Sequence, residues 1–125
     1  MHRLVLAALL LAAIACGDHG PPVYSDPSQP IEVRAGSEFV LALKSNQSTG
    51  YRWVVADYDA LAPLQLISTD YTVPRENRDR NGAGGTERWT FRAPSPGNST
   101  ISLAYRRLLK SQPPADSMRF RVTVR

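Results

Sequence analysis

The chain has very little of what an enzyme site needs. Its 125 residues contain one cysteine and two histidines, and both histidines, His2 and His19, precede the region with strand-like patterning. A serine or threonine nucleophile requires a neighbouring base, and no histidine follows position 19 to serve as one. No cluster of histidine and cysteine indicates zinc. We therefore expect a protein that is not an enzyme and that uses no metal or cofactor.

The single cysteine also excludes a disulfide within the chain, so the fold must depend on its hydrophobic core. Residues 4–15 form an apolar run of about 12 residues, shorter than the roughly 20 that a transmembrane helix needs. Arg3 precedes this run, and small residues end it at Ala15, as in a secretory signal peptide. We expect residues 1–15 to be removed, which leaves about 110 residues, enough for one core.

Two interpretations of Cys16 stay open. Ala13-Ile14-Ala15-Cys16 resembles the lipobox of bacterial lipoproteins, in which the cysteine is lipidated and becomes the new N-terminus, although Ala13 replaces the usual leucine. Ordinary signal cleavage after Ala15 would instead leave a free N-terminal cysteine. We favour lipidation because a lone exported cysteine has no other evident use. Both interpretations export the protein, to the periplasmic or cell-surface side of a membrane.

Residues 17–30 hold four prolines and no apolar periodicity. This composition predicts a flexible tether, residues 16–30 including the lipidated cysteine, followed by one domain at 31–125. The formal charge of the whole chain is +4, and its arginines are scattered rather than clustered. A charge this mild does not indicate a nucleic-acid partner.

From residue 31 onward apolar and polar residues alternate in seven short segments. These segments are centred on residues 31–34, 39–43, 51–55, 64–68, 88–92, 101–106 and 118–125. They predict an all-β, immunoglobulin-like β-sandwich of about seven antiparallel strands, in which Leu64 and Leu66 share one face. Helical structure should not exceed one turn, near residues 60–63.

Antiparallel succession also predicts where the connections lie. The second, fourth and sixth connections, at residues 46–50, about 74–85 and about 107–117, should meet at one end of the sandwich. Two of them are long for a compact domain, and long loops are usually functional or disordered. We therefore expect a composite binding edge at this end, as antibody loops form.

Simpler interpretations of the same loops exist. Glu76, Asp79 and Glu87 alternate with arginines, which indicates paired surface charges rather than calcium ligands. The glycines at 82–85 either form a tip that approaches a partner closely or a plain linker. Leu108 either extends a strand or serves as an exposed apolar anchor.

Three short segments carry a family resemblance. They are Asn46-Gln47-Ser48-Thr49-Gly50-Tyr51, Gly82-Ala83-Gly84-Gly85 and Arg107-Leu108-Leu109, in this order. In this respect the chain, over residues 31–125, resembles a bacterial, exported member of the chagasin family of cysteine-protease inhibitors, whose loops read N-P-T-T-G-Y/F, G-x-G-G and R-P-W/F. Gln47 and Ser48 depart from the first pattern, and Leu108 and Leu109 replace the proline and aromatic of the third.

The resemblance implies a reversible steric inhibitor of papain-like cysteine proteases, acting as a monomer. Residues 46–51 would enter the protease cleft, where small residues fit a narrow slot and their backbone could make strand-like hydrogen bonds. The other two loops would grip the cleft walls. The expected protease-binding residues are Asn46, Gln47, Ser48, Thr49, Gly50, Tyr51, Gly82, Ala83, Gly84, Gly85, Arg107, Leu108 and Leu109.

A different function is compatible with the same fold. An immunoglobulin-like module of the cell envelope could bind a protein or a glycan for adhesion or assembly, because a fold does not by itself determine a function. The degenerate third loop and the tether favour this alternative.

Overall fold

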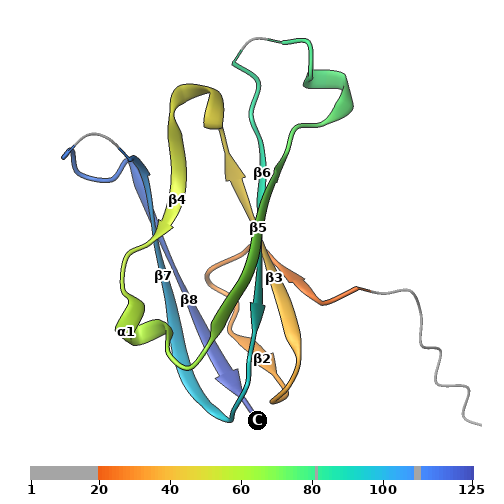
Figure 1. The fold of residues 1–125 in the computed structure, drawn as a ribbon, viewed down its shortest axis with the longest axis vertical. Helices are drawn as coiled ribbons and strands as arrows, with labels where there is room; N and C mark the ends of the chain where they lie inside the picture. Colours follow the sequence, from red (N-terminus) through yellow and green to blue (C-terminus); the bar gives the residue numbers. More distant parts are fainter. Residues whose placement is uncertain (1–19, 81, 109–110) are drawn as a thin grey trace, which may run out of the picture.

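The computed structural model describes residues 20–80, 82–108 and 111–125. In these residues the elements are β1 (Val23–Tyr24), β2 (Ile31–Val33), β3 (Glu38–Ser45), β4 (Tyr51–Val55), α1 (Tyr58–Leu61), β5 (Gln65–Thr72), β6 (Gly85–Arg92), β7 (Gly97–Arg107) and β8 (Asp116–Val124). Two four-stranded sheets, in the orders β1-β3-β6-β5 and β2-β8-β7-β4, form a sandwich (Figure 1). The predicted all-β sandwich is thus confirmed.

Two strand pairings differ from the predicted set of antiparallel strands. β1 runs parallel to β3, and β2 runs parallel to β8, with Ile31 opposite Val122. β2 leads into β3 in the other sheet, so no hairpin sets its direction. β1 is an eighth strand inside the segment predicted to be a tether, residues 16–30, and the folded domain therefore begins before Ile31. Two residues are too few to show alternation, which is why the sequence pattern misses it.

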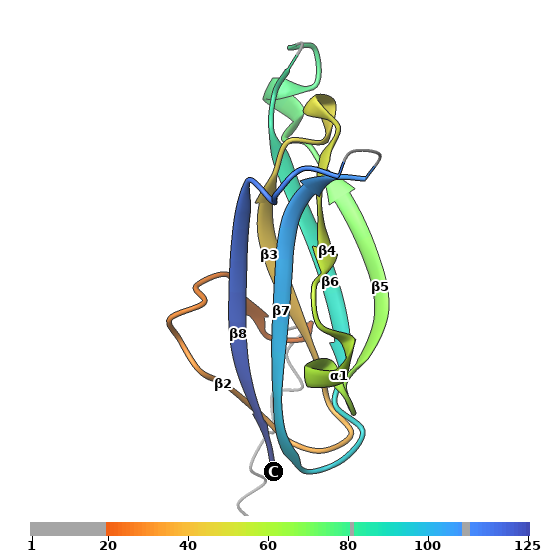
Figure 2. The same ribbon diagram turned by 90° about the vertical axis from the view of Figure 1, so that its left-hand side faces the viewer.

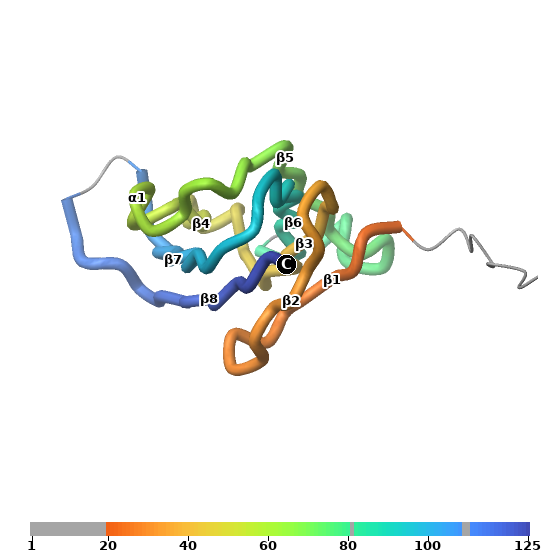
Figure 3. Tube along the Cα trace, turned by 90° about the horizontal axis from the view of Figure 1, so that it is seen from below, coloured from red at the N-terminus to blue at the C-terminus, as the bar shows by residue number. Residues whose placement is uncertain are grey.

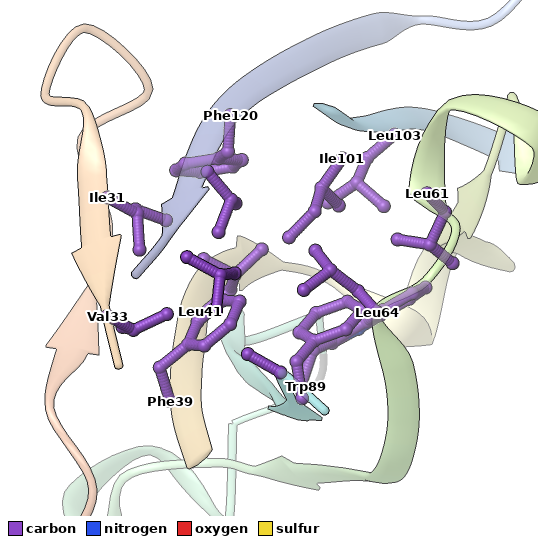
Figure 4. Close-up of a cluster of buried hydrophobic side chains, with 14 of the residues drawn as sticks. Ile31, Val33, Phe39, Leu41, Leu61, Leu64, Trp89, Ile101, Leu103 and Phe120 are labelled. Atoms are coloured by element: carbon purple, nitrogen blue, oxygen red, sulfur yellow. The ribbon is translucent and has the colours of Figure 1, made fainter. Parts of the chain in front are cut away.

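The core lies between the two sheets and consists of inward-facing strand residues together with Leu61 of α1, Leu64 and Ala93 (Figure 4). Phe39 and Phe91 stack with ring centroids 5.5 Å apart, and Phe120 from the other sheet is fully buried. Burying a large apolar side chain contributes about 1.5–3 kcal/mol. Because the described residues contain no cysteine, this packing is the main source of stability.

The edge strand β5 departs from its predicted pattern. Leu64 is buried just before the strand, whereas Leu66 and Ile67 are 40% and 50% exposed. The pairing with β6 shifts between Leu66 and Ser68, which marks a β-bulge. Leu66 lies opposite the buried Phe91 and therefore faces the core side of the sheet, but it stays partly exposed because β5 is an edge strand. The bulge changes the direction of the side chains that follow it.

Among the described residues, helical structure is confined to short turns: α1 lies close to the turn predicted near residues 60–63, whereas two 3₁₀ turns, Gln47–Thr49 and Arg75–Asn77, were not predicted. α1 is capped by Asp57, whose carboxylate accepts a hydrogen bond from the Ala60 N–H at 3.1 Å. Such side-chain capping satisfies an N–H that has no partner in the first turn. No helix in the described part of the chain is long and apolar enough to span a membrane.

A buried carboxylate joins the two sheets. Glu87, on β6, is 4% exposed, and its two oxygens accept hydrogen bonds from the Trp53 backbone N–H at 3.2 Å and the Trp89 indole N–H at 3.1 Å. The Trp53 indole N–H donates to the carbonyl of Lys44 at 3.0 Å. These bonds connect β4 with β3 and β6. They therefore fix the strand ends that flank residues 46–50 relative to the start of β6.

Candidate functional site

Three connections meet at the end of the sandwich opposite the C-terminus, which we call the loop end (Figures 1 and 2). They are residues 46–50, 73–84 and 108–115. Figure 3 views the molecule from the opposite end, where the C-terminus lies. The gathering predicted from antiparallel succession is therefore observed. One hydrogen bond joins the first two connections, and another joins the first connection to the end of β7, where the third begins. The Asn46 side-chain amide donates to the Gly82 carbonyl at 2.8 Å, and Arg107 Nε donates to the Thr49 carbonyl at 3.2 Å.

Residues 46–50 form a compact turn rather than an extended segment. Gln47–Thr49 is a 3₁₀ turn, and Gly50 closes it with φ of 82°, a left-handed conformation that favours glycine. The Thr49 hydroxyl donates to the Asn46 carbonyl at 2.6 Å, and the Ser48 hydroxyl donates to Asn46 Oδ1 at 2.5 Å. Such side-chain bonds to local groups compete with strand pairing.

The strand-like hydrogen bonds expected between this turn and a protease cleft stay a prediction, but two amides of the turn already have partners within it. The Thr49 N–H donates to the Asn46 carbonyl at 3.2 Å, and the Gly50 N–H donates to the Gln47 carbonyl at 3.0 Å. Both amides are used inside the turn. In the free protein these residues therefore present a compact turn.

Two tyrosines from opposite sheets hold the start of the turn. The Tyr105 hydroxyl, from β7, accepts the Asn46 backbone N–H at 2.8 Å. The Tyr71 hydroxyl, from β5, accepts the Gln47 N–H at 3.4 Å and donates to the Ser45 carbonyl at 3.4 Å. The site residues chosen from the sequence include neither tyrosine. Their position in the sequence could have indicated this role. Each is an aromatic residue with a hydroxyl, and each lies near the end of a strand that leads into a long loop.

Arg107 and Tyr51 support the end of the turn, at Thr49 and Gly50. The Arg107 guanidinium lies 4.8 Å from the centroid of the Tyr51 ring, within cation–π range. The Tyr51 ring lies 5.3 Å from that of Tyr105, which in turn lies 5.0 Å from Trp53. This series of aromatic contacts connects the turn to the core.

The residues expected to bind a protease therefore divide into two groups. Those that are exposed are Ser48, Thr49, Gly50, Gly82, Gly84 and Leu108. Those that are half-buried are Asn46, Gln47, Tyr51, Ala83, Gly85 and Arg107. Leu108 is 56% exposed, which fits the anchor interpretation, whereas Leu109 and the lipidation candidate Cys16 lie outside the described residues.

The charged residues of the second loop are not paired as the sequence pattern suggests. Glu87 is buried beneath the loop, where it binds the two tryptophans. In the part of the chain that the structure describes, the ion pair present joins Arg125 to Glu32 at 3.2 Å, and none involves residues 73–84. The arginines of that segment are exposed. Among the described residues no group of three histidine, cysteine, aspartate or glutamate side chains is placed to hold a metal ion.

Comparisons with known proteins agree with this geometry. The family model described as Chagasin family peptidase inhibitor I42 matches residues 32–124. No curated protein matches the chain.

Solved structures give the same architecture. The solution structure of amebosin is 24% identical, with a TM-score of 0.66, and the match covers 85% of this chain and 100% of that one. The crystal structure of a cysteine protease inhibitor from Entamoeba histolytica is 18% identical, with a TM-score of 0.65 and coverages of 83% and 95%. The structure of PbICP-C in complex with falcipain-2 is 16% identical, with a TM-score of 0.54 and coverages of 85% and 90%. At these identities the likeness shows the fold.

Two adjacent glycines of the second loop should respond differently to alanine. A Cβ on Gly85 would lie 2.3 Å from the Thr72 carbonyl oxygen, whereas a Cβ on Gly84 would meet nothing closer than 3.5 Å. We expect Gly85→Ala to lower the free energy of unfolding by about 1–3 kcal/mol, because β5 and β6 must separate. The matched control Gly84→Ala should change it by about 0.5 kcal/mol or less. Urea denaturation measures the free energy of unfolding of both variants. Equal values would contradict the close packing of Gly85 against Thr72.

Proposed function

This chain belongs to the chagasin family of peptidase inhibitors, and we propose that it reversibly inhibits papain-like cysteine proteases through its loop end. Members of this family are inhibitors rather than enzymes. The proposal is based mainly on the small exposed turn at residues 46–50, which is hydrogen-bonded to Gly82 of the second connection and to Arg107 at the end of β7, where the third connection begins. The target class is supported by PbICP-C, which has the same fold and was solved with falcipain-2.

We propose that inhibition is steric. Ser48, Thr49 and Gly50 are the exposed part of the turn, and their small side chains suit a narrow cleft that holds a catalytic cysteine. The hydroxyls of Ser48 and Thr49 donate to Asn46 within the turn, and none of the described residues is a histidine that could activate them. The turn would therefore block the cleft without reacting, and dissociation would release the chain intact.

The turn is held in shape before it meets a partner. Tyr71, Tyr105 and Arg107 bond its backbone from three directions. Binding a preformed turn avoids the entropic cost of ordering a flexible loop, which for a side chain alone is about 0.5–1.5 kcal/mol. An interface of standard size, roughly 1,600 Å² in total, would also include the neighbouring connections.

The flanking connections have complementary roles in this proposal. Gly82 and Gly84 are exposed, and the absence of side chains allows backbone to approach a cleft wall closely. Leu108 offers an apolar surface that is 56% exposed and would lie against the opposite wall. Leucine supplies less contact area than an aromatic ring, so its contribution to affinity should be moderate.

We further propose that the protein is a bacterial lipoprotein of the cell envelope. The support comes from the sequence: an apolar run at residues 4–15 that ends in small residues immediately before Cys16. Lipidation of this cysteine would hold the inhibitor at a membrane surface on the exported side. The segment between Cys16 and β1 would then separate the domain from the membrane.

Substitutions in the turn should weaken inhibition without unfolding the protein. Gly50→Val places a β-branched residue at φ of 82°, which we expect to distort the turn and raise the inhibition constant for papain at least about tenfold. Thr49→Ala loses the hydroxyl bond to Asn46 and should raise it about fivefold. Ser95→Ala, at the opposite end, is the control. Unchanged inhibition constants for both turn variants, with melting temperatures like that of the wild type, would refute the role of the turn.

The anchor can be tested by phase partitioning. When the full chain is expressed in a bacterium, we expect the mature protein to enter the detergent phase of a Triton X-114 extraction, because a lipidated cysteine is strongly apolar. Cys16→Ser should move it to the aqueous phase. If the wild-type protein is aqueous too, ordinary signal cleavage is the correct interpretation.

A further inference from the structure

Positive charge is concentrated at the loop end. The cationic side chains on its connections and on the adjoining strand ends are Lys44, Arg52, Arg75, Arg78, Arg80, Arg106 and Arg107. The carboxylates there are the exposed Glu76, Asp79 and Asp116 and the buried Glu87. The corresponding groups at the opposite end are Glu32, Arg34, Glu38, Asp57, Asp59, Arg92 and Arg125. The modest charge of the whole chain, +4, is therefore unevenly distributed, and one end is clearly cationic while the other is nearly neutral.

The protein does not neutralise this charge internally. Arg75, Arg78 and Arg80 are exposed, and within the described residues no carboxylate lies within ion-pair distance of them. On the neighbouring side, Arg52 stands directly opposite Arg106 in the pairing of β4 with β7. Like charges in this arrangement destabilise a sheet. Arg106 donates a hydrogen bond to the Gln112 carbonyl at 3.1 Å, but among the described residues no carboxylate forms an ion pair with either arginine.

The two groups of arginines lie on different sides of the turn. In Figure 1 the connection between β5 and β6, with Arg75, Arg78 and Arg80, lies on one side of the turn and extends beyond it. β4, which carries Arg52, descends directly from the turn, and β7, which carries Arg106, pairs with β4 on the other side. The turn itself, residues 46–50, carries no charged side chain. A partner that receives the turn in its cleft would thus meet cationic groups along both margins of that cleft.

We propose that the loop end selects papain-like proteases whose cleft is bordered by acidic residues, and that it does so chiefly by accelerating association. This inference rests on the proposed function and adds the chemistry of the partner. Complementary charges at the border of an interface steer two proteins together and raise the association rate by 10- to 1,000-fold, an effect that salt suppresses. Charges in the border contribute less to the rate of dissociation.

The test compares two variants that lose the same charge. The loop variant carries Arg75→Gln, Arg78→Gln and Arg80→Gln, and the control carries Arg34→Gln, Arg119→Gln and Arg121→Gln, all exposed positions away from the loop end. Stopped-flow association rates are measured at about 0.02 and 0.5 M salt, which spans strong and weak screening. The proteases are two papain-like enzymes of known structure, one with an acidic and one with a basic cleft border.

For the acidic protease we expect wild type and control to associate about tenfold faster at low salt than at high salt. The loop variant should lose most of this acceleration while its dissociation rate changes less than about threefold. Equal losses in the loop variant and the control, or the same salt dependence with the basic protease, would overturn the inference while leaving inhibition intact. Failure of the wild-type chain to inhibit either protease at either salt concentration would instead overturn the proposed function, and the inference with it.

Discussion

The hydrogen bonds around Asn46 are the interactions on which the loop end depends. Its backbone N–H donates to the hydroxyl of Tyr105 in one sheet. Its side-chain amide donates to the carbonyl of Gly82, on the connection between β5 and β6 of the other sheet. Its own carbonyl accepts the hydroxyl and the amide of Thr49. One residue thus determines both the shape of the turn and its position relative to the second connection. A change at Asn46 would affect all of these contacts together.

The core transmits its rigidity to this network through a few polar contacts. Glu87 holds Trp53 and Trp89 across the sheets, and the Trp53 ring lies against Tyr105, whose hydroxyl receives the Asn46 amide. Packed interiors and satisfied buried hydrogen bonds deform little. The described domain therefore presents a defined surface without a disulfide. For a steric inhibitor this matters, because affinity depends on how little ordering remains to be done at binding.

Much of this architecture could be predicted from alternation of apolar residues, which requires no knowledge of tertiary contacts. Alternation located β3, β4, β6, β7 and β8, and antiparallel succession then placed three connections at one end. β1 was missed because two residues carry no period, and the parallel pairings were missed because no hairpin defines them. The roles of Tyr71, Tyr105 and Glu87 depend on residues far apart in sequence meeting at a loop base, and a pattern along one chain segment contains no such information. The 3₁₀ turn at Gln47–Thr49 was not predicted, because the side-chain bonds of Ser48 and Thr49 to Asn46 were not considered.

Steric inhibition by the loop end requires the turn at residues 46–50 to be ordered in the free protein. Backbone ¹⁵N relaxation of the unbound chain measures this order, because order parameters report motion of each amide on the picosecond-to-nanosecond timescale. We expect the amides of Asn46, Thr49 and Gly50 to have values of about 0.85, like those of β3 and β7. Values below about 0.6 for these amides, with rigid strands on either side, would show that the turn is flexible before binding and would contradict the claim.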